Sequence, residues 1–168
     1  MQEKDILFIK KELESAQNPM FIYDSDGDGL SSFLLMYRHV REGKGVIFRY
    51  AKRQVDVDLI RKVDEINPDK IFILDLPDVS QEFIDKAKRP VFWIDHHPII
   101  NRMNVKYFNP LKEDPNAIFL QLKWFMRLLE IKKICGLPLQ EFWQILQCLN
   151  LLMSILRSTL IYLKKECQ

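Results

Sequence analysis

Cysteine is scarce and irregularly spaced in this sequence of 168 residues. The three cysteines, Cys135, Cys148 and Cys167, form no CxxC pair, and their number is odd. These features argue against a disulfide framework and against a thiolate zinc site. Net charge is also small, at +2, so composition neither predicts nor excludes a polyanionic partner.

Long apolar runs are missing as well. The first residues, MQEKDILFIKKELE, include early acidic side chains, which argues against a secretory signal. The most apolar stretch, residues 139–163, is interrupted by polar and charged side chains such as Glu141 and Arg157. It would make a poor membrane span. We therefore expect a cytoplasmic protein with no membrane partner.

The composition changes sharply near Ala117. All thirteen aspartates lie at or before Asp114, whereas all three cysteines lie after it. We predict an α/β domain in residues 1–117, followed by a Leu-rich tail in residues 118–168 that is helical or poorly specified. Its apolar residues have roughly helical spacing in FLQLKWFMRLLEI and FWQILQCLNLLMSIL, and such helices would also offer a surface for homodimerisation.

Apolar runs and helical patterns alternate through residues 1–117. We expect a short helix over 3–16, a strand that ends at Asp24, and a helix from Ser31 onward. The residues expected on the inner face of that helix are Phe33, Leu34, Tyr37 and Val40. Further strands are expected at 46–51, 70–76, 91–95 and 105–108, and further helices at 56–66 and 80–87. This order predicts βαβ units and a doubly wound, mostly parallel, five-stranded sheet.

Acidic side chains and histidines follow three of these strands directly. They are Asp24, Asp26 and Asp28 after the first, Asp75 and Asp78 after the third, and Asp95, His96 and His97 after the fourth. The carboxyl ends of parallel strands line the ligand crevice of an open sheet, so we expect these groups to converge. Crowded carboxylates repel one another, and divalent cations remove that cost. Oxygen ligands with imidazole favour Mn²⁺ or Mg²⁺.

Each motif alone has a plainer interpretation. The segment DSDGDG could be a solvated turn, because Asp and Gly are turn formers. A calcium loop would need Glu at its twelfth position, where this sequence has Leu35. Asp75 could merely end a strand, and the two histidines could be surface residues. The three motifs together favour a site for two cations, which could bridge a phosphate and generate hydroxide.

Three segments resemble the motifs of DHH-family phosphoesterases of the RecJ type. They are DSDGDGLSS at 24–32, ILDLPD at 73–78 and DHH at 95–97. The resemblance covers about residues 18–117. It implies hydrolysis of phosphodiester or phosphoanhydride bonds with two divalent cations, Mn²⁺ preferred or Mg²⁺. The implied substrates are single-stranded nucleic acid, short oligonucleotides, cyclic dinucleotides, pyrophosphate and polyphosphate.

The resemblance also implies roles for individual residues. The implied metal ligands are Asp26, Asp28, Asp75 and His96. Among the catalytic residues, Asp75 would bridge both metals, Asp95 would orient the imidazoles, and His97 would contact the substrate phosphate. Residues expected to support the ligands or contact substrate are Asp24, Ser31 and Ser32.

A fourth metal-binding Asp, which the family carries in a later helix, has no counterpart after Asp114. One hypothesis is that the tail is out of frame. With permitted codons shifted by two bases, residues 133–145 encode DMWIATAGILAD, which resembles that fourth motif. The same shift over residues 119–132 gives FPTTKMVYEIIGNK. A single base lost near Ala117 would explain the changed composition and the missing ligand.

Three functions compete at this point. The first is a metal-dependent phosphoesterase, most closely a RecJ-like single-strand nuclease or a fragment of one. The second is a non-catalytic binding module that keeps the fold, and the third is a small-molecule phosphoesterase acting on a cyclic dinucleotide or pyrophosphate. Side chains that could contact nucleic acid are Tyr50, Lys52, Arg53, Arg102 and Tyr107, although such residues more often serve as surface charge and sheet packing.

Overall fold

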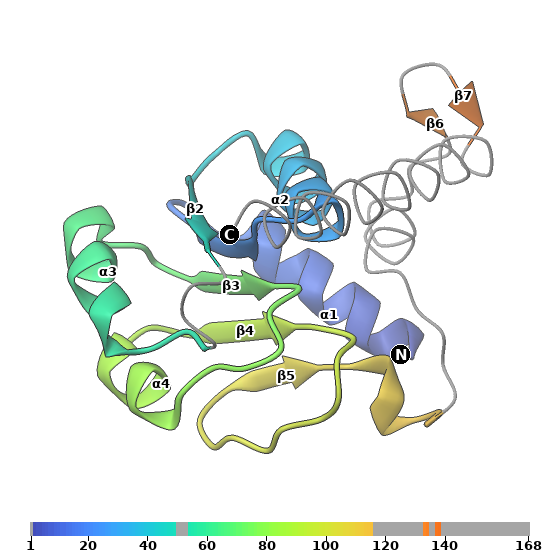
Figure 1. Ribbon diagram of the computed structural model, residues 1–168. Coiled ribbons are helices and arrows are strands. Elements are labelled where there is room, and N and C mark those ends of the chain that lie inside the picture. Colours follow the sequence, from blue (N-terminus) through green and yellow to red (C-terminus); the bar gives the residue numbers. More distant parts are fainter. Residues whose placement is uncertain (1, 50–53, 116–132, 135–136, 139–168) are drawn as a thin grey trace, which may run out of the picture. The chain divides into compact units, whose positions relative to one another are not determined.

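The computed structural model describes residues 2–49, 54–115, 133–134 and 137–138. The chain consists of two compact units, Met1–Glu130 and Ile131–Gln168. The first unit is an α/β domain (Figure 1). Its strands are β1 (Met20–Asp24), β2 (Lys44–Phe48), β3 (Ile71–Leu74), β4 (Val91–Ile94) and β5 (Lys106–Phe108). Its helices are α1 (Glu3–Glu14), α2 (Gly27–Val40), α3 (Ile60–Ile66) and α4 (Gln81–Ala87), with short 3-10 turns η1 (Val57–Leu59) and η2 (Pro110–Lys112).

The five strands form one sheet in the order β2-β1-β3-β4-β5. Every neighbouring pair in this sheet is parallel, so the expected mostly parallel sheet is in fact wholly parallel. The chain passes from β1 outward to β2 and then back across to β3. The winding direction therefore reverses between β1 and β3, which is where open α/β sheets carry their ligands.

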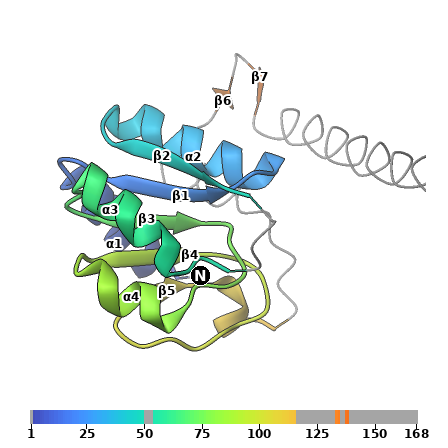
Figure 2. The same cartoon turned by 60° about the vertical axis from the view of Figure 1, so that its left-hand side comes forward.

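Helices cover both faces of the sheet (Figures 1 and 2). On one face, α3 and α4 lie side by side over the even-numbered side chains of β1, Met20 and Ile22. On the other face, Phe8 of α1 contacts Phe92 of β4, with ring centroids 6.3 Å apart. Strands β1, β3 and β4 are buried along their whole length. Burial on both faces explains why these strands read as continuous apolar runs in the sequence.

The helix α2 differs from its expected form at two points. It begins at Gly27 and not near Ser31, because Asp26 caps it and the second half of DSDGDG forms its first turn. The expected inner face was wrong at Leu34, which is 45% exposed, and at Tyr37, which is 38% exposed, whereas the ring of Phe33 stacks on Tyr23 of β1 with centroids 4.4 Å apart. The buried residues of the helix are Asp28, Gly29, Ser32, Leu35 and Met36. Apolar residues stand at nearly every position from 33 to 37, so their spacing could not identify the buried face.

Within the second unit, the structure describes two short antiparallel strands, β6 (Lys133–Ile134) and β7 (Leu137–Pro138). The expected Leu-rich helices and their dimer surface otherwise lie outside the described residues. Among the helices in the described part of the chain, none is long and apolar enough to cross a membrane.

Candidate metal centre

The first side of the site is the start of α2. The Asp26 carboxylate caps this helix, since its Oδ1 accepts the backbone N–H groups of Asp28, at 3.1 Å, and Gly29, at 2.9 Å. Gly29 lies against the end of β1, where a Cβ atom would come within 2.6 Å of the Asp24 carbonyl oxygen. The glycine thus allows the helix to begin directly over the strand end. This close approach brings Asp24, Asp26 and Asp28 to the same edge of the sheet.

Asp75 occupies the centre of the site, immediately after β3. It is 1% exposed, and its backbone adopts a left-handed conformation with φ of 57°. Non-glycine residues seldom adopt this conformation, although Asp and Asn tolerate it best. Burial, together with repulsion from the carboxylates of Asp28, Asp26, Asp95 and Asp24, raises the pKa of Asp75 to about 9.

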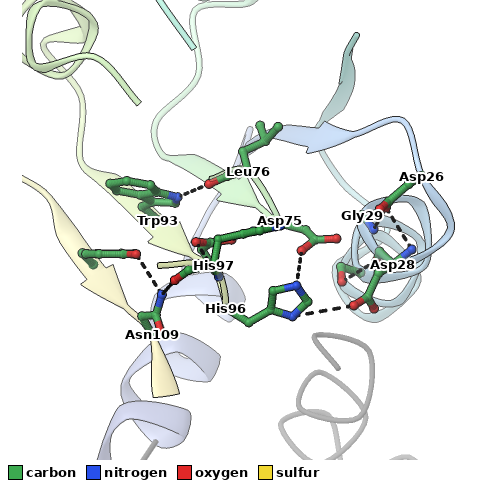
Figure 3. A network of polar contacts seen from close by, with 12 residues as sticks. Asp26, Asp28, Gly29, Asp75, Leu76, Trp93, His96, His97 and Asn109 are labelled. Carbon is green, nitrogen blue, oxygen red and sulfur yellow. Dashed lines mark hydrogen bonds and ion pairs between the residues drawn. The ribbon is translucent and has the colours of Figure 1, made fainter. Parts of the chain in front are cut away.

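His96 lies between two of the carboxylates (Figure 3). Its Nε2 atom is 3.4 Å from Asp75 Oδ1, and its Nδ1 atom is 3.9 Å from Asp28 Oδ2. The imidazole thereby connects the end of β3 with the first turn of α2. The three motifs that are far apart in the sequence converge at one edge, as expected.

Asp95 and His97 form a second pair beside this group. The fully buried Asp95 accepts the backbone N–H of His97 through Oδ2 at 3.0 Å, and its Oδ1 lies 2.7 Å from His97 Nδ1. The hydrogen bond to Asp95 raises the pKa of His97. Asp95 therefore fixes the orientation of the His97 ring, which matches part of the orienting role expected for this carboxylate.

Asp24, Ser31 and Ser32 lie close to the site but are engaged locally. Asp24 is 2% exposed, its Oδ1 accepts the Ser25 backbone N–H, and burial raises its pKa. The Ser31 hydroxyl donates to the Gly27 carbonyl at 2.6 Å, and the Ser32 hydroxyl donates to the Asp28 carbonyl at 2.7 Å. Both hydroxyl protons thus support the first turns of α2. A substrate contact by these serines stays a prediction.

Other residues from the motifs lie apart from this cluster. Asp78 Oδ1 accepts a hydrogen bond from Arg102 at 3.0 Å, and Arg102 also donates to the Val79 carbonyl. Arg102 therefore anchors the loop between β4 and β5. The ring of Tyr107 stacks on Trp93, with centroids 4.1 Å apart, as expected if it serves sheet packing. The remaining candidate nucleic-acid contacts, Tyr50, Lys52 and Arg53, lie outside the described residues.

The donor set fits a divalent cation. One ligand atom each from Asp75, His96 and His97 lies within 4.8 Å of the others. Asp75 Oδ1 and His96 Nδ1 are buried and make no hydrogen bond within the described part of the chain. A buried polar atom without a hydrogen bond is costly unless another ligand satisfies it. Oxygen and imidazole donors of this kind suit Mn²⁺ or Mg²⁺.

Two residues that sequence reasoning missed donate hydrogen bonds to the backbone of the loops that carry the site. The Trp93 indole N–H donates to the Leu76 carbonyl at 2.8 Å, and the Asn109 amide donates to the His97 carbonyl at 2.8 Å. A buried Trp usually finds a partner for its N–H group, so VFWID carried some signal for the first contact. Asn109 stands directly before Pro110 at the end of β5, a common turn signal that does not identify its partner.

These features define a class of protein, an open parallel α/β domain with a cluster of carboxylates and histidines that could hold a metal ion at the carboxyl edge of its sheet. The model of the DHH family, N-terminal domain, matches residues 20–126. The chain belongs to the DHH family, and the resemblance stated from its three motifs is confirmed.

Two solved structures share the fold. A manganese-bound exonuclease RecJ is 17% identical, has a TM-score of 0.59, and matches 77% of this chain but 37% of its own length. RecJ from Thermus thermophilus, in complex with Mn²⁺, is 14% identical, with a TM-score of 0.55, and matches 75% of this chain and 19% of its own. The chain thus spans well under half the length of either RecJ. Among curated proteins, none matches this sequence.

Proposed function

We propose that this domain binds two divalent cations and hydrolyses phosphodiester or phosphoanhydride bonds. The observation that carries the proposal is Asp75, a buried carboxylate in a left-handed backbone conformation, with one oxygen that makes no hydrogen bond within the described residues. It lies beside His96 and within the repulsive field of Asp28. Such an arrangement is unfavourable for a protein that binds no cation and favourable for one that does.

Each residue then has a separate task. The residues that would hold the cations are Asp26, Asp28, Asp75 and His96. Bound cations of this kind supply a hydroxide nucleophile and stabilise the leaving oxygen. His97, oriented by Asp95, would donate a hydrogen bond from Nε2 to a phosphate oxygen. The buried carboxylate of Asp24 would add negative charge beside the start of α2, where the cations would bind.

Single-stranded nucleic acid is the substrate class that we favour, because the two similar structures described above are RecJ proteins and one of them is named an exonuclease. A cyclic dinucleotide or pyrophosphate is the alternative. A non-catalytic binding module is the second candidate function. It is favoured by one observation, that no aspartate follows Asp114 to act as the fourth ligand of the family.

The test is Mn²⁺-dependent hydrolysis of a 5′-labelled oligonucleotide, a cyclic dinucleotide and pyrophosphate by the full chain. Asp75→Ala serves as the inactive control. A second chain with the reading frame restored after Ala117 is assayed beside it. Hydrolysis of none of these substrates by either chain would reject the enzyme and leave the binding module. Equal activity of both chains would show that the fourth ligand is dispensable.

The frame hypothesis itself is tested by sequencing the gene across codons 110–168. We propose that a shifted frame encodes a segment ending in Asp that completes the metal centre. If the other two frames of codons 118–168 encode no such segment, the tail is genuine.

A further inference from the structure

Each of the two loops that carry Asp75 and His97 accepts a hydrogen bond, at a backbone carbonyl, from a side chain on or directly after a neighbouring strand (Figure 3). Trp93, on β4, donates its indole N–H to the carbonyl of Leu76, the residue directly after Asp75. Asn109, at the end of β5, donates its amide N–H to the carbonyl of His97. Both contacts measure 2.8 Å, and both are made by side chains that are at most 3% exposed.

Tyr107 connects these two contacts. Its ring stacks on Trp93 with an interplanar angle of 17°, and its hydroxyl oxygen accepts a hydrogen bond from the Asn109 amide at 2.8 Å. Asn109 is itself oriented, because its Oδ1 accepts the backbone N–H of Leu111 at 2.9 Å. A continuous path of contacts therefore runs from the Leu76 carbonyl to the His97 carbonyl across β4 and β5.

The location of this path suggests a task beyond packing. The left-handed backbone conformation is unfavourable for Asp relative to ordinary backbone, so Asp75 keeps its direction only if its surroundings hold it. The Asp75 N–H donates to the Ile94 carbonyl on β4, which fixes one side of this residue. The Trp93 contact with Leu76 fixes the other side. Both anchors of Asp75 thus lie on the strand that leads into Asp95, His96 and His97.

We propose that Trp93, Tyr107 and Asn109 form a positioning brace that holds the loops of Asp75 and His97 at the spacing that a cation requires. This inference rests on the proposed metal centre and deepens it. None of the three side chains contacts the cation or the substrate in this scheme. Their effect reaches the site through the backbones of Leu76 and His97 and, from the Tyr107 side chain, through its interaction with Asp95. Partners of this kind typically change metal affinity by about 10–100-fold when they are removed.

The experiment compares Mn²⁺ affinity, measured by electron paramagnetic resonance titration, in full-length variants. Asn109→Ala removes the donor to His97, and Tyr107→Phe removes only the hydroxyl while retaining the stacked ring. The matched control is Asn18→Ala at the opposite end of the sheet, where Asn18 donates to the carbonyls of Ile66 and Asn67. The control loses hydrogen bonds of the same type, and thermal unfolding reports how far each variant is destabilised.

We expect Asn109→Ala to lower Mn²⁺ affinity about 10-fold or more, and Tyr107→Phe to lower it by a smaller factor. Asn18→Ala should bind Mn²⁺ as the unmodified protein does, even if its unfolding temperature falls by a similar amount. Combining Asn109→Ala with Trp93→Phe should weaken binding little beyond the worse single variant, because contacts in one network are not additive. Unchanged Mn²⁺ affinity in Asn109→Ala would overturn the brace.

A metal-free readout separates this inference from the proposed function. In amide NMR spectra of the protein without added cation, Asn109→Ala should shift the Leu76 backbone amide and the Trp93 indole N–H, as well as His97. Shifts confined to His97 and Leu111 would show that no brace exists. If the unmodified protein binds no Mn²⁺ yet these distant shifts occur, the proposed metal centre fails while the brace stands.

Discussion

Charged side chains have different surroundings at the two ends of the parallel sheet. At the amino end, charged groups have partners. Asp69 accepts the backbone N–H groups of Gln17 and Asn18 at 2.7 and 2.9 Å. Lys70, before β3, donates to both the carbonyl and the carboxylate of Glu12 at 2.8 Å. These contacts tie α1 to the sheet and cost little, because each charge meets an opposite charge or an N–H dipole.

At the carboxyl end, carboxylates gather against one another. Burial and mutual repulsion raise the pKa of Asp75 to about 9, and burial raises that of Asp24. The imidazoles of His96 and His97 lie within ion-pair range of Asp75 and Asp95 respectively, and Asp95 also accepts the His97 backbone N–H. The charged groups therefore stabilise the sheet at its amino end, whereas the carboxylates at its carboxyl end repel one another. We infer that folding depends on the amino end and that cation binding uses the carboxyl end.

The largest effect should come from Asp75→Asn. Asn tolerates the left-handed backbone, keeps the size of the side chain and removes its charge. Hydrolysis and Mn²⁺ affinity should fall by more than about 100-fold, because a central ligand is lost. The metal-free variant should nevertheless be more stable at pH 8 than the metal-free parent, because the parent must take up a proton at Asp75 on folding and Asn needs none.

Calorimetry with and without Mn²⁺ checks both halves of this prediction. Excess Mn²⁺ at about 100 times its dissociation constant should stabilise the parent protein by about 2.7 kcal/mol and the variant by nearly nothing. A variant that is less stable than the parent without metal would mean that Asp75 is a structural residue. The contrast between the two ends would then be wrong.

The next prediction concerns the pH dependence of the metal-free protein. The folded-state pKa of Asp75 is about 9, above the unfolded value of about 3.9. The folded state therefore binds more protons between these values, and the free energy of unfolding should fall as pH rises from about 4 to about 9. Because coupled carboxylates share the shift, we expect a loss of roughly 2–4 kcal/mol over this range.

Urea unfolding at a series of pH values measures this loss. The Asp75→Asn variant is the control, and its stability should depend much less on pH across the same window. Saturating Mn²⁺ should also flatten the curve for the parent protein, because a bound cation favours the ionised carboxylates. Stability that rises with pH between 5 and 8 in the metal-free parent would contradict the prediction.

Much of the carboxyl end could be predicted from the sequence because its motifs are local. Each of the three follows an apolar strand directly, and parallel strands bring their ends to one edge. The left-handed conformation of Asp75 could not be predicted, since it depends on contacts with Ile94 and Trp93 across the sheet. The link from Asn109 to His97 spans twelve residues and no periodic pattern records it. The buried face of α2 depends on the fit of Gly29 over β1.

The third prediction compares a glycine from each end of the sheet. A Cβ atom at Gly29 would lie 2.6 Å from the Asp24 carbonyl oxygen, and one at Gly43 would lie 2.2 Å from the Pro19 carbonyl oxygen. Gly43 also has φ of 99°, which disfavours any side chain. We expect Gly29→Ala and Gly43→Ala each to lower the free energy of unfolding by roughly 1–3 kcal/mol.

Mn²⁺ affinity separates the two glycine variants. Gly29→Ala should weaken binding, because it moves the start of α2 and with it Asp26 and Asp28. Gly43→Ala should leave binding unchanged, because it acts at the amino end. Titration by electron paramagnetic resonance, well below the unfolding temperature, measures both. Equal loss of affinity would show that general destabilisation, and not local geometry, controls the site.

The smallest effect should come from Lys70→Met at the amino end. Methionine keeps most of the aliphatic chain but loses the hydrogen bonds to Glu12 and to the Ser15 hydroxyl. The Lys70 side chain is 15% exposed and that of Glu12 is 26% exposed, so solvent screens their ion pair only in part. We expect a loss of about 1 kcal/mol in the free energy of unfolding, measured by urea titration.

The informative control is Arg61→Ala, which removes an exposed pair with Glu65 on α3. It should change stability by less than about 0.5 kcal/mol, because exposed ion pairs contribute little. Neither substitution should alter Mn²⁺ affinity or the pH dependence that Asp75 sets. If Lys70→Met weakened Mn²⁺ binding as strongly as a change in the brace of Trp93, Tyr107 and Asn109, the two ends would be coupled through β3. The division between a stabilising end and a binding end would then have to be abandoned.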